Sequence, residues 1–367
     1  MSINDIIRDY INETHDAAYQ YAIKNNKSVD EPGLISKFLE NHKDLEKELN
    51  NSNKNLKYLI DVIFTHQTPK IKAIDRSRSV EIADLLLINI HHGSQKTETS
   101  GKALLIQAKR NNTPTSGSLA RGTEAIQFYI YNKWPKFSFT SRSQNFKSIS
   151  TNWDFNFKKS EEHSFYAVIY DSKLFHNHTL YSPSFINANF HQNCSWNTAQ
   201  CEFLQVTPSK GLTCNTSFSN LFSHFIMNNA GRTFSPSLAA NGEHWSIFIN
   251  DMMTLAKDPS YIYHLSRQGI SESQRHVRMQ SFMINDAILS SVKTSLTDLE
   301  KNTSPPNHHL DLSLPNILLN YYFNEGHPPS TPKEIANTDT RIPPSTPPIM
   351  IIHTIDLEGI FTSDAYK

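Results

Sequence analysis

Asp84, Gln107 and Lys109 are the residues whose types and spacing best suit chemistry in this sequence. Gln107 and Lys109 stand two apart in the apolar stretch Leu104–Arg110, so a strand would place both side chains on one face. Asp84 directly precedes the apolar run Leu85–Ile88. A polar pair on a buried strand costs free energy unless it is hydrogen-bonded or binds something. We therefore interpret the three residues as a candidate site shared by two neighbouring strands.

The elements that would position these residues follow from the hydrophobic pattern. Residues 3–24 and a segment capped by Asp30 have apolar residues at helical spacing, as do residues 119–133. The charged stretch 41–53 is either a continuation of the second helix or a loop. Four segments rich in Ile, Val or Leu are expected strands: residues 70–74, 80–90, 102–110 and 164–170. This order predicts an α/β fold, a mixed sheet covered by helices.

The second half of the chain has a weaker pattern. Residues 327–348 are proline-rich and are expected to be an extended linker or a surface arm. Residues 349–353 are a candidate strand that either docks back or pairs with another chain. We expect a boundary near residue 175, with the site in residues 1–175 and a mostly helical region for recognition or oligomerisation in residues 176–367. Four segments there have helical spacing: residues 217–229, 245–257, 275–300 and 310–323.

Composition limits the classes of function. Lys and Arg total 35 and so do Asp and Glu, so contact with nucleic acid is expected at local patches only. Three cysteines are too few for a disulfide scaffold, and the chain shows neither a signal-peptide pattern nor an apolar run of about 20 residues. We expect a cytoplasmic protein with no membrane partner. Glycine-rich phosphate loops, dinucleotide fingerprints and G-x-S-x-G elbows are absent from the sequence.

An acid on one strand followed by Gln-x-Lys on the next resembles the PD-(D/E)XK (restriction-endonuclease-like) nuclease superfamily. The resemblance rests on Asp84, on Gln107-Ala108-Lys109 and on the element order, over roughly residues 30–175. It implies a restriction-endonuclease-like core and a Mg²⁺-dependent endonuclease that cuts DNA, with Mn²⁺ as a second candidate metal. It also implies a role in prokaryotic anti-phage defence.

The chemistry implied for each residue follows from the resemblance. Asp84, the side-chain oxygen of Gln107 and the carbonyl of Ala108 would hold the metal, since Mg²⁺ prefers hard oxygen ligands. Lys109 would position or deprotonate the attacking water, or stabilise the charge of the transition state. A plainer interpretation stays open, in which Asp84 ends a turn and the other two form a solvated strand end.

The chain departs from the commonest family pattern because Gln107 is neutral where many members have an acid. Glu81 and Glu40 are the candidate acids that would compensate. Glu81 stands three residues before Asp84 and needs a bulge or twist to reach the same face. Glu40 lies on the second expected helix, where some members supply an acid; either residue is otherwise an ordinary surface glutamate. The neutral Gln107 also leaves room for a non-catalytic subunit that binds nucleic acid or a partner.

Candidate contacts to nucleic acid surround the expected site. They are basic or amide side chains on the flanking elements: Lys70, Lys72, Arg76, Arg78, Arg110, Arg121 and Gln127. Residues 133–159 interleave basic residues with aromatic residues that either stack on bases or belong to the core. The expected partners are DNA, further copies of the chain, or a partner protein of a defence system.

Overall fold

The computed structural model describes thirteen segments of the chain: residues 1–26, 28–53, 55–63, 69–92, 101–112, 116–117, 123–140, 152–157, 163–171, 194–199, 212–214, 216–257 and 347–356. The chain divides into two compact units, Met1–Arg278 with Pro343–Lys367, and Met279–Ile342. Every described residue belongs to the first unit. The helices expected over residues 275–300 and 310–323, and the proline-rich segment up to residue 346, lie outside the described residues.

A mixed sheet of eight strands runs through the described part of the first unit. Strand β13 is parallel to β4, and β8 is parallel to β5, whereas the other pairs are antiparallel. The mixed sheet expected from the sequence is confirmed. Its strands stand in the following order, with β12 (Arg232–Phe234) added beside β5: β1 (Leu56–Ile63), β13 (Ile349–Asp356), β4 (Leu85–His92), β5 (Gly101–Asn111), β8 (Ser164–Tyr170), β9 (Trp196–Ala199) and β11 (Thr216–Ser217).

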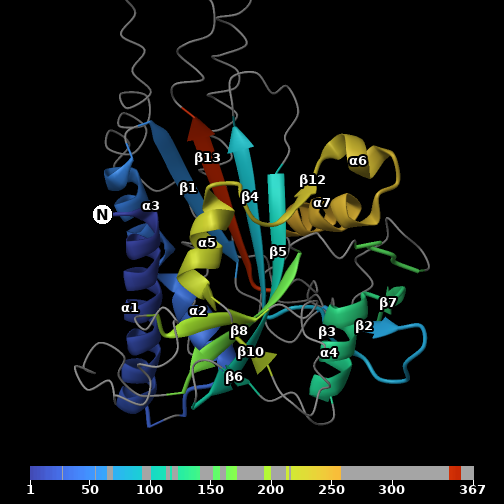
Figure 1. The fold of residues 1–367 in the computed structure, drawn as a ribbon, viewed down its shortest axis with the longest axis horizontal. Coiled ribbons are helices and arrows are strands. Elements are labelled where there is room, and N and C mark those ends of the chain that lie inside the picture. The colour runs from blue at the N-terminus through green and yellow to red at the C-terminus, as the bar shows by residue number, and fades with distance from the viewer. Residues whose placement is uncertain are drawn as a thin grey trace, which may run out of the picture. The chain divides into compact units, whose positions relative to one another are not determined.

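Strand β13 lies inside this sheet, between β1 and β4, although it comes last among the described elements (Figure 1). Ile349, Met350 and Ile352 are fully buried, as expected for a strand covered on both faces. Of the two alternatives that the sequence left open for this segment, docking back onto the sheet is the one found. Strands β9, β11 and β12 also follow residue 175 and join the same sheet. The sheet therefore crosses the predicted boundary, because strand pairing and not chain order decides which segments share a core.

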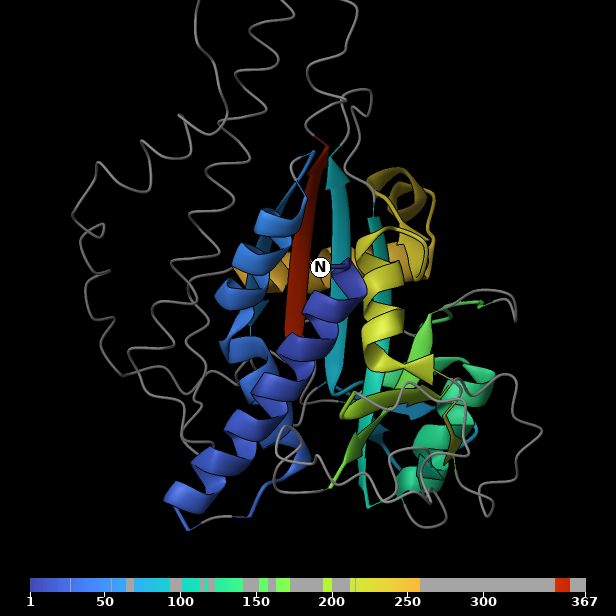
Figure 2. The same cartoon turned by 60° about the vertical axis from the view of Figure 1, so that its left-hand side comes forward.

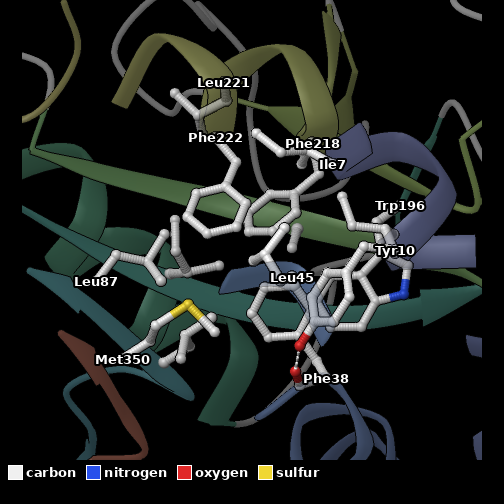
Figure 3. Packing of buried hydrophobic residues seen from close by; sticks show 14 of the residues in the cluster. Ile7, Tyr10, Phe38, Leu45, Leu87, Trp196, Phe218, Leu221, Phe222 and Met350 are labelled. Carbon is white, nitrogen blue, oxygen red and sulfur yellow. Dashed lines mark hydrogen bonds between the residues drawn. The ribbon is translucent and has the colours of Figure 1, made fainter. Parts of the chain in front are cut away.

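Four helices cover one face of the sheet: α1 (Ile3–Lys24), α2 (Glu31–Glu40), α3 (His42–Ser52) and α5 (Phe218–Ile226) (Figures 1 and 2). Asp30 caps α2 by accepting the N–H of Gly33 at 2.8 Å, as its position in the sequence predicts. Tyr10 and Phe38 pack with Trp196 and Phe222 in the core beneath these helices (Figure 3). Burial of each such side chain contributes about 1.5–3 kcal/mol. The hydroxyl of Tyr10 donates to the carbonyl of Phe38.

Helix α3 closes the outer edge of β1 with its side chains. The amide of Asn50 donates to the carbonyl of Tyr58 and accepts its N–H, both at 2.9 Å. Glu46 accepts the N–H of Ile60 at 2.6 Å. Helical residues four apart are separated by about 6 Å along the helix axis, which is close to the distance between alternate residues of a strand. One face of a helix can therefore hydrogen-bond to alternate residues along a strand edge. The stretch 41–53 is thus a helix, and its polar residues satisfy an exposed strand edge.

A second, three-stranded sheet carries the segment that precedes Asp84. It is formed by β3 (Val80–Glu81), β2 (Lys70–Ala73) and β7 (Phe137–Phe139), next to α4 (Thr123–Lys133) (Figure 1). The prediction of a single strand over residues 80–90 was wrong. The chain bends at residues 82–84 and passes from this sheet into β4. The remaining described elements are β6 (Ser116–Gly117), β10 (Leu212–Thr213), α6 (Pro236–Ala240) and α7 (His244–Lys257).

The aromatic residues of the stretch 133–159 belong largely to a core. Trp134, Phe137, Trp153 and Phe155 are all buried and contact one another. Phe248 of α7 packs against this group. Base stacking by these four rings is therefore ruled out, and the alternative that they are core residues is confirmed. Phe146 lies outside the described residues.

Candidate functional site

A fork between β4 and β5 positions the three candidate residues. Pairing of β4 with β5 ends at Leu85 opposite Ile106, and the N–H of Asp84 donates to the carbonyl of Ile106 at 2.9 Å. Past this point no described strand pairs with β5 on that side, while residues up to Asn111 still pair with β8 on the other. The chain before Asp84 turns away toward the three-stranded sheet. A strand edge that side chains, rather than a neighbouring strand, must satisfy is thereby left beside the Asp84 carboxyl group.

Asp84 contacts the Gln-x-Lys segment directly. Its Oδ2 accepts the backbone N–H of Ala108 at 2.7 Å and also accepts Nε2 of Gln107. In a strand the N–H and C=O of one residue point to the same side, so the carbonyl of Ala108 also faces the fork. The arrangement expected from the sequence, with Asp84 beside Gln107 and Ala108, is present.

Gln107 and Lys109 lie on the face of β5 opposite the helical core. Their neighbours Ile106 and Ala108 belong to that core, so alternation turns the polar pair the other way. Gln107 is 1% exposed, yet its Oε1 atom has no hydrogen-bond partner among the residues that the structure describes. Lys109 is 9% exposed, and no ion pair of its amine with a described residue is found. Buried polar atoms without partners are rare in proteins, and such an atom at a fork suits a ligand.

Glu81 joins Asp84 because the chain bends between them. In an uninterrupted strand residues three apart face opposite sides, but residues 82–84 form the break between β3 and β4. The two carboxyl groups interact, and Lys109 acts electrostatically on both. The break is the twist that the sequence required for Glu81 to reach the site.

The pKa values at the fork are shifted because several carboxyl groups lie close together with few positive charges beside them. The pKa of Asp84 is raised to about 8, mainly by burial; Glu81 and Glu31 add to the rise, and Lys109 opposes it. Burial likewise raises the pKa of Glu81, against the opposing effects of Lys70 and Lys109. A cation or a shared proton would stabilise such a cluster.

Glu31 is a neighbour of the site that the sequence did not reveal. It stands at the first position of α2, and its Oε1 accepts the backbone N–H of Arg110 at 3.1 Å. The amides of Ala108 and Arg110 point to the same edge of β5 and are about 7 Å apart. Asp84 and Glu31 therefore accept hydrogen bonds from neighbouring N–H groups along this edge. The only signal in the sequence was an acid directly after the N-cap residue Asp30.

Glu40, the acid expected from the second helix, lies at the other end of α2. It pairs with Lys37 at 2.6 Å. The two ends of α2 are about 13 Å apart along the helix axis. The helix therefore brings Glu31, rather than Glu40, to the edge of β5.

Arg110 is held by its own fold. Its guanidinium donates to the carbonyl of Val29, just before α2, and lies 3.7 Å from the carboxylate of Asp171. Tyr19 of α1 donates to the same Asp171 at 2.7 Å. A side chain tied in this way anchors the start of α2 to the end of β5, which differs from the phosphate contact expected of it.

The other expected contacts to nucleic acid have varied positions. Lys70, Lys72, Arg76 and Arg78 are exposed on β2 and the turn that follows, and Lys70 stands directly opposite Glu81. Arg76 lies over the ring of Tyr129 at 4.0 Å. Gln127 is buried in α4, away from open solvent. Arg121 lies outside the described residues.

Comparison of the chain with protein-family models, curated proteins and solved structures finds no match. Among the described residues, no group of three or more His, Cys, Asp or Glu side chains is arranged to hold a metal ion. None of the described helices combines the length and apolar character that crossing a bilayer demands. Amide and carbonyl oxygens thus have to complete any metal site at the fork.

Proposed function

We propose that this chain is a metal-dependent nuclease with a restriction-endonuclease-like core that hydrolyses phosphodiester bonds of DNA. The observation that carries the proposal is the contact of Asp84 with Gln107 and Ala108 at the fork, beside the unpartnered Oε1 of Gln107. Three residue types from two segments meet there as the Asp…Gln-x-Lys pattern requires. The role in prokaryotic defence stays a prediction from the resemblance.

The residues at the fork suit a Mg²⁺ ion. The carboxylate of Asp84, Oε1 of Gln107 and the carbonyl of Ala108 are hard oxygen donors, and no described residue bonds to the Gln107 oxygen. When bound there, the ion supplies Lewis-acid polarisation of the phosphate and a more acidic water. Glu81 adds a further carboxyl group next to Asp84.

Lys109 has the position of a group that acts on the reacting phosphate. It shares a face of β5 with Gln107, and the residue is 9% exposed. In such surroundings a fixed positive charge stabilises negative charge more strongly than it would in water. Lys109 thus orients the attacking water and stabilises the charge that accumulates on the phosphate oxygens.

The exposed lysines of β2 extend this site across the surface. Lys70 and Lys72 share the exposed face of the three-stranded sheet, and Lys70 stands opposite Glu81. Arg76 and Arg78 continue the positive charge into the following turn. Side chains of this type bind backbone phosphates without reading the base sequence, which suits a strand that approaches the fork over β2.

A cleavage assay tests the proposal. Wild type, Asp84→Asn, Lys109→Met and the control Lys102→Met are incubated with plasmid and single-stranded DNA in Mg²⁺, Mn²⁺ or EDTA. Lys102 lies on the same strand, opposite Asn89 and away from the fork. We expect metal-dependent cutting by wild type and Lys102→Met, and a loss of about 100-fold or more in the two site variants.

Two outcomes would contradict the nuclease. Cutting that survives both site variants would place the activity elsewhere. DNA binding by wild type, without cutting in any metal, would favour the non-catalytic subunit that the neutral Gln107 leaves open.

A further inference from the structure

The bend between Glu81 and Asp84 is held by hydrogen bonds to both backbone groups of Ile82. Ile82 is the first residue of this bend and is fully buried. Its N–H donates to the carbonyl of Pro69 at 3.0 Å. Its carbonyl accepts the hydroxyl of Tyr131 at 2.9 Å. The N–H bond continues the pairing of β2 with β3 by one residue, but proline has no N–H to give to the Ile82 carbonyl in return. The hydroxyl of Tyr131 takes that place, so it fixes the carbonyl at the point where the chain turns.

Tyr131 reaches this bend from α4 and is itself fixed. It is 1% exposed, and its ring lies 5.3 Å from the rings of both Trp134 and Tyr166. Tyr166 is the register partner of Gln107 on β8. Partners on adjacent strands face the same side of a sheet, so Tyr166 stands next to Gln107. Tyr131 thus contacts the neighbour of Gln107 with its ring and the acid-bearing bend with its hydroxyl.

We propose that Tyr131 is a positioning residue that sets the distance between the Glu81–Asp84 pair and the Gln107–Lys109 strand. Glu81 immediately precedes Ile82, and Asp84 follows it by two residues, so a shift of the Ile82 carbonyl moves both acids. The hydroxyl of Tyr131 donates to the backbone carbonyl of Ile82, so it acts on the two acids through the backbone. The expected effect of Tyr131 on catalysis rests on the proposed function. The expected effect of Tyr131 on the position of Asp84 is independent of it.

The substitution Tyr131→Phe removes only the hydroxyl and keeps the ring between Trp134 and Tyr166. Tyr10→Phe is the matched control, because it also removes a buried tyrosine hydroxyl that donates to a backbone carbonyl, that of Phe38. Tyr10 belongs to the core under the helices, on the other face of the sheet (Figure 3). Each variant removes a buried hydroxyl that donates to a backbone carbonyl, so a difference between them reports where that hydroxyl lies.

The catalytic readout is a steady-state analysis of DNA cleavage. For Tyr131→Phe we expect kcat to fall about tenfold or more, with KM for DNA within about twofold, since small displacements of reacting groups slow the chemical step. The Mg²⁺ concentration for half-maximal rate should rise, since Asp84 is displaced from Gln107. Tyr10→Phe should match wild type in all three quantities. Equal values in the two variants would overturn the proposal.

A second readout needs no activity. The amide of Ala108 is protected by Asp84, so its hydrogen exchange reports the position of that carboxyl group. We expect exchange to be about tenfold faster in Tyr131→Phe than in Tyr10→Phe at equal temperature and pH. If wild type does not cut DNA but Ala108 exchange differs in this way, the nuclease fails and the positioning role stands. If exchange is the same in both variants, the positioning role fails whatever the activity of wild type.

Discussion

The carboxylate of Asp84 takes the backbone N–H of Ala108 at 2.7 Å, in the place where a paired strand would have supplied a carbonyl. Strand β4 has stopped pairing with β5 two residues earlier, at Ile106. One step further along the same edge, Glu31 takes the N–H of Arg110. An unpaired strand edge thus gathers acids from two distant segments of the chain, and this is why a polar site forms in the interior of an apolar sheet.

The acid supplied by the N-terminal helices is predicted to be Glu31. Glu31→Gln should lower the rate of DNA cleavage about 10–100-fold, as loss of a group next to metal ligands commonly does. Glu40→Gln, at the opposite end of the same helix, should change the rate less than about twofold. Initial rates at saturating Mg²⁺ decide between the two. A loss confined to Glu40→Gln would restore the acid expected from the sequence.

The exposed basic face of β2 and its turn should determine binding to DNA rather than the chemical step. Lys72→Gln combined with Arg78→Gln should weaken binding in EDTA and reduce the slope of log K against log salt by about 0.7–0.9 for each phosphate that the variant no longer binds. Lys24→Gln with Lys47→Gln makes the same change in net charge at exposed helical positions and serves as the control. Equal slopes in the two double variants would remove this surface from the binding site.

Asn50 should stabilise the fold by sealing the edge of β1. Asn50→Ala leaves the N–H and C=O of Tyr58 without their partner, and we expect a loss of about 1–3 kcal/mol in the free energy of unfolding. Asn51→Ala changes an exposed neighbour and gains the same helix propensity, so their difference isolates the two hydrogen bonds. Urea unfolding of both variants measures it. Equal midpoints would mean that water replaces Asn50 without cost.

His163 should make the fold sensitive to acid. Burial and then Arg232 lower the pKa of its imidazole to about 3, and its ring stacks on Phe157 at 3.6 Å. The unfolded chain keeps the ordinary value of about 6.5, so it binds more protons below that pH, and stability is lost as pH falls. Between pH 7 and pH 5 wild type should lose about 2 kcal/mol relative to His163→Gln.

Urea unfolding of both proteins at the two pH values tests this difference. Asp84 and Glu81 have raised pKa values and act in the opposite direction, but they do so in both proteins and cancel. An unchanged difference between wild type and His163→Gln would show that the imidazole does not titrate on unfolding.

Local patterns were enough to predict much of this fold. The apolar spacing of residues 3–24, the cap at Asp30 and the alternation in Leu104–Arg110 each depend on neighbours in the sequence, and each is present in the structure. The same alternation placed Gln107 and Lys109 on one face, opposite the core. Pattern alone also predicted that residues 349–353 form a strand, because an uninterrupted apolar run suits burial on both faces.

Only the tertiary structure decided which distant segments meet. Helix capping shows where α2 begins, but only docking on β5 shows that Glu31, and not Glu40, reaches the strand edge. Arg110 looks like a phosphate ligand in sequence, yet the nearby Val29 carbonyl and Asp171 engage it. The bend at Ile82, which unites Glu81 with Asp84, depends on a hydroxyl from α4, almost fifty residues along the chain. The alternation of side chains in the sequence predicts which face of a strand a residue occupies. Which residues it contacts on that face depends on how distant segments pack together.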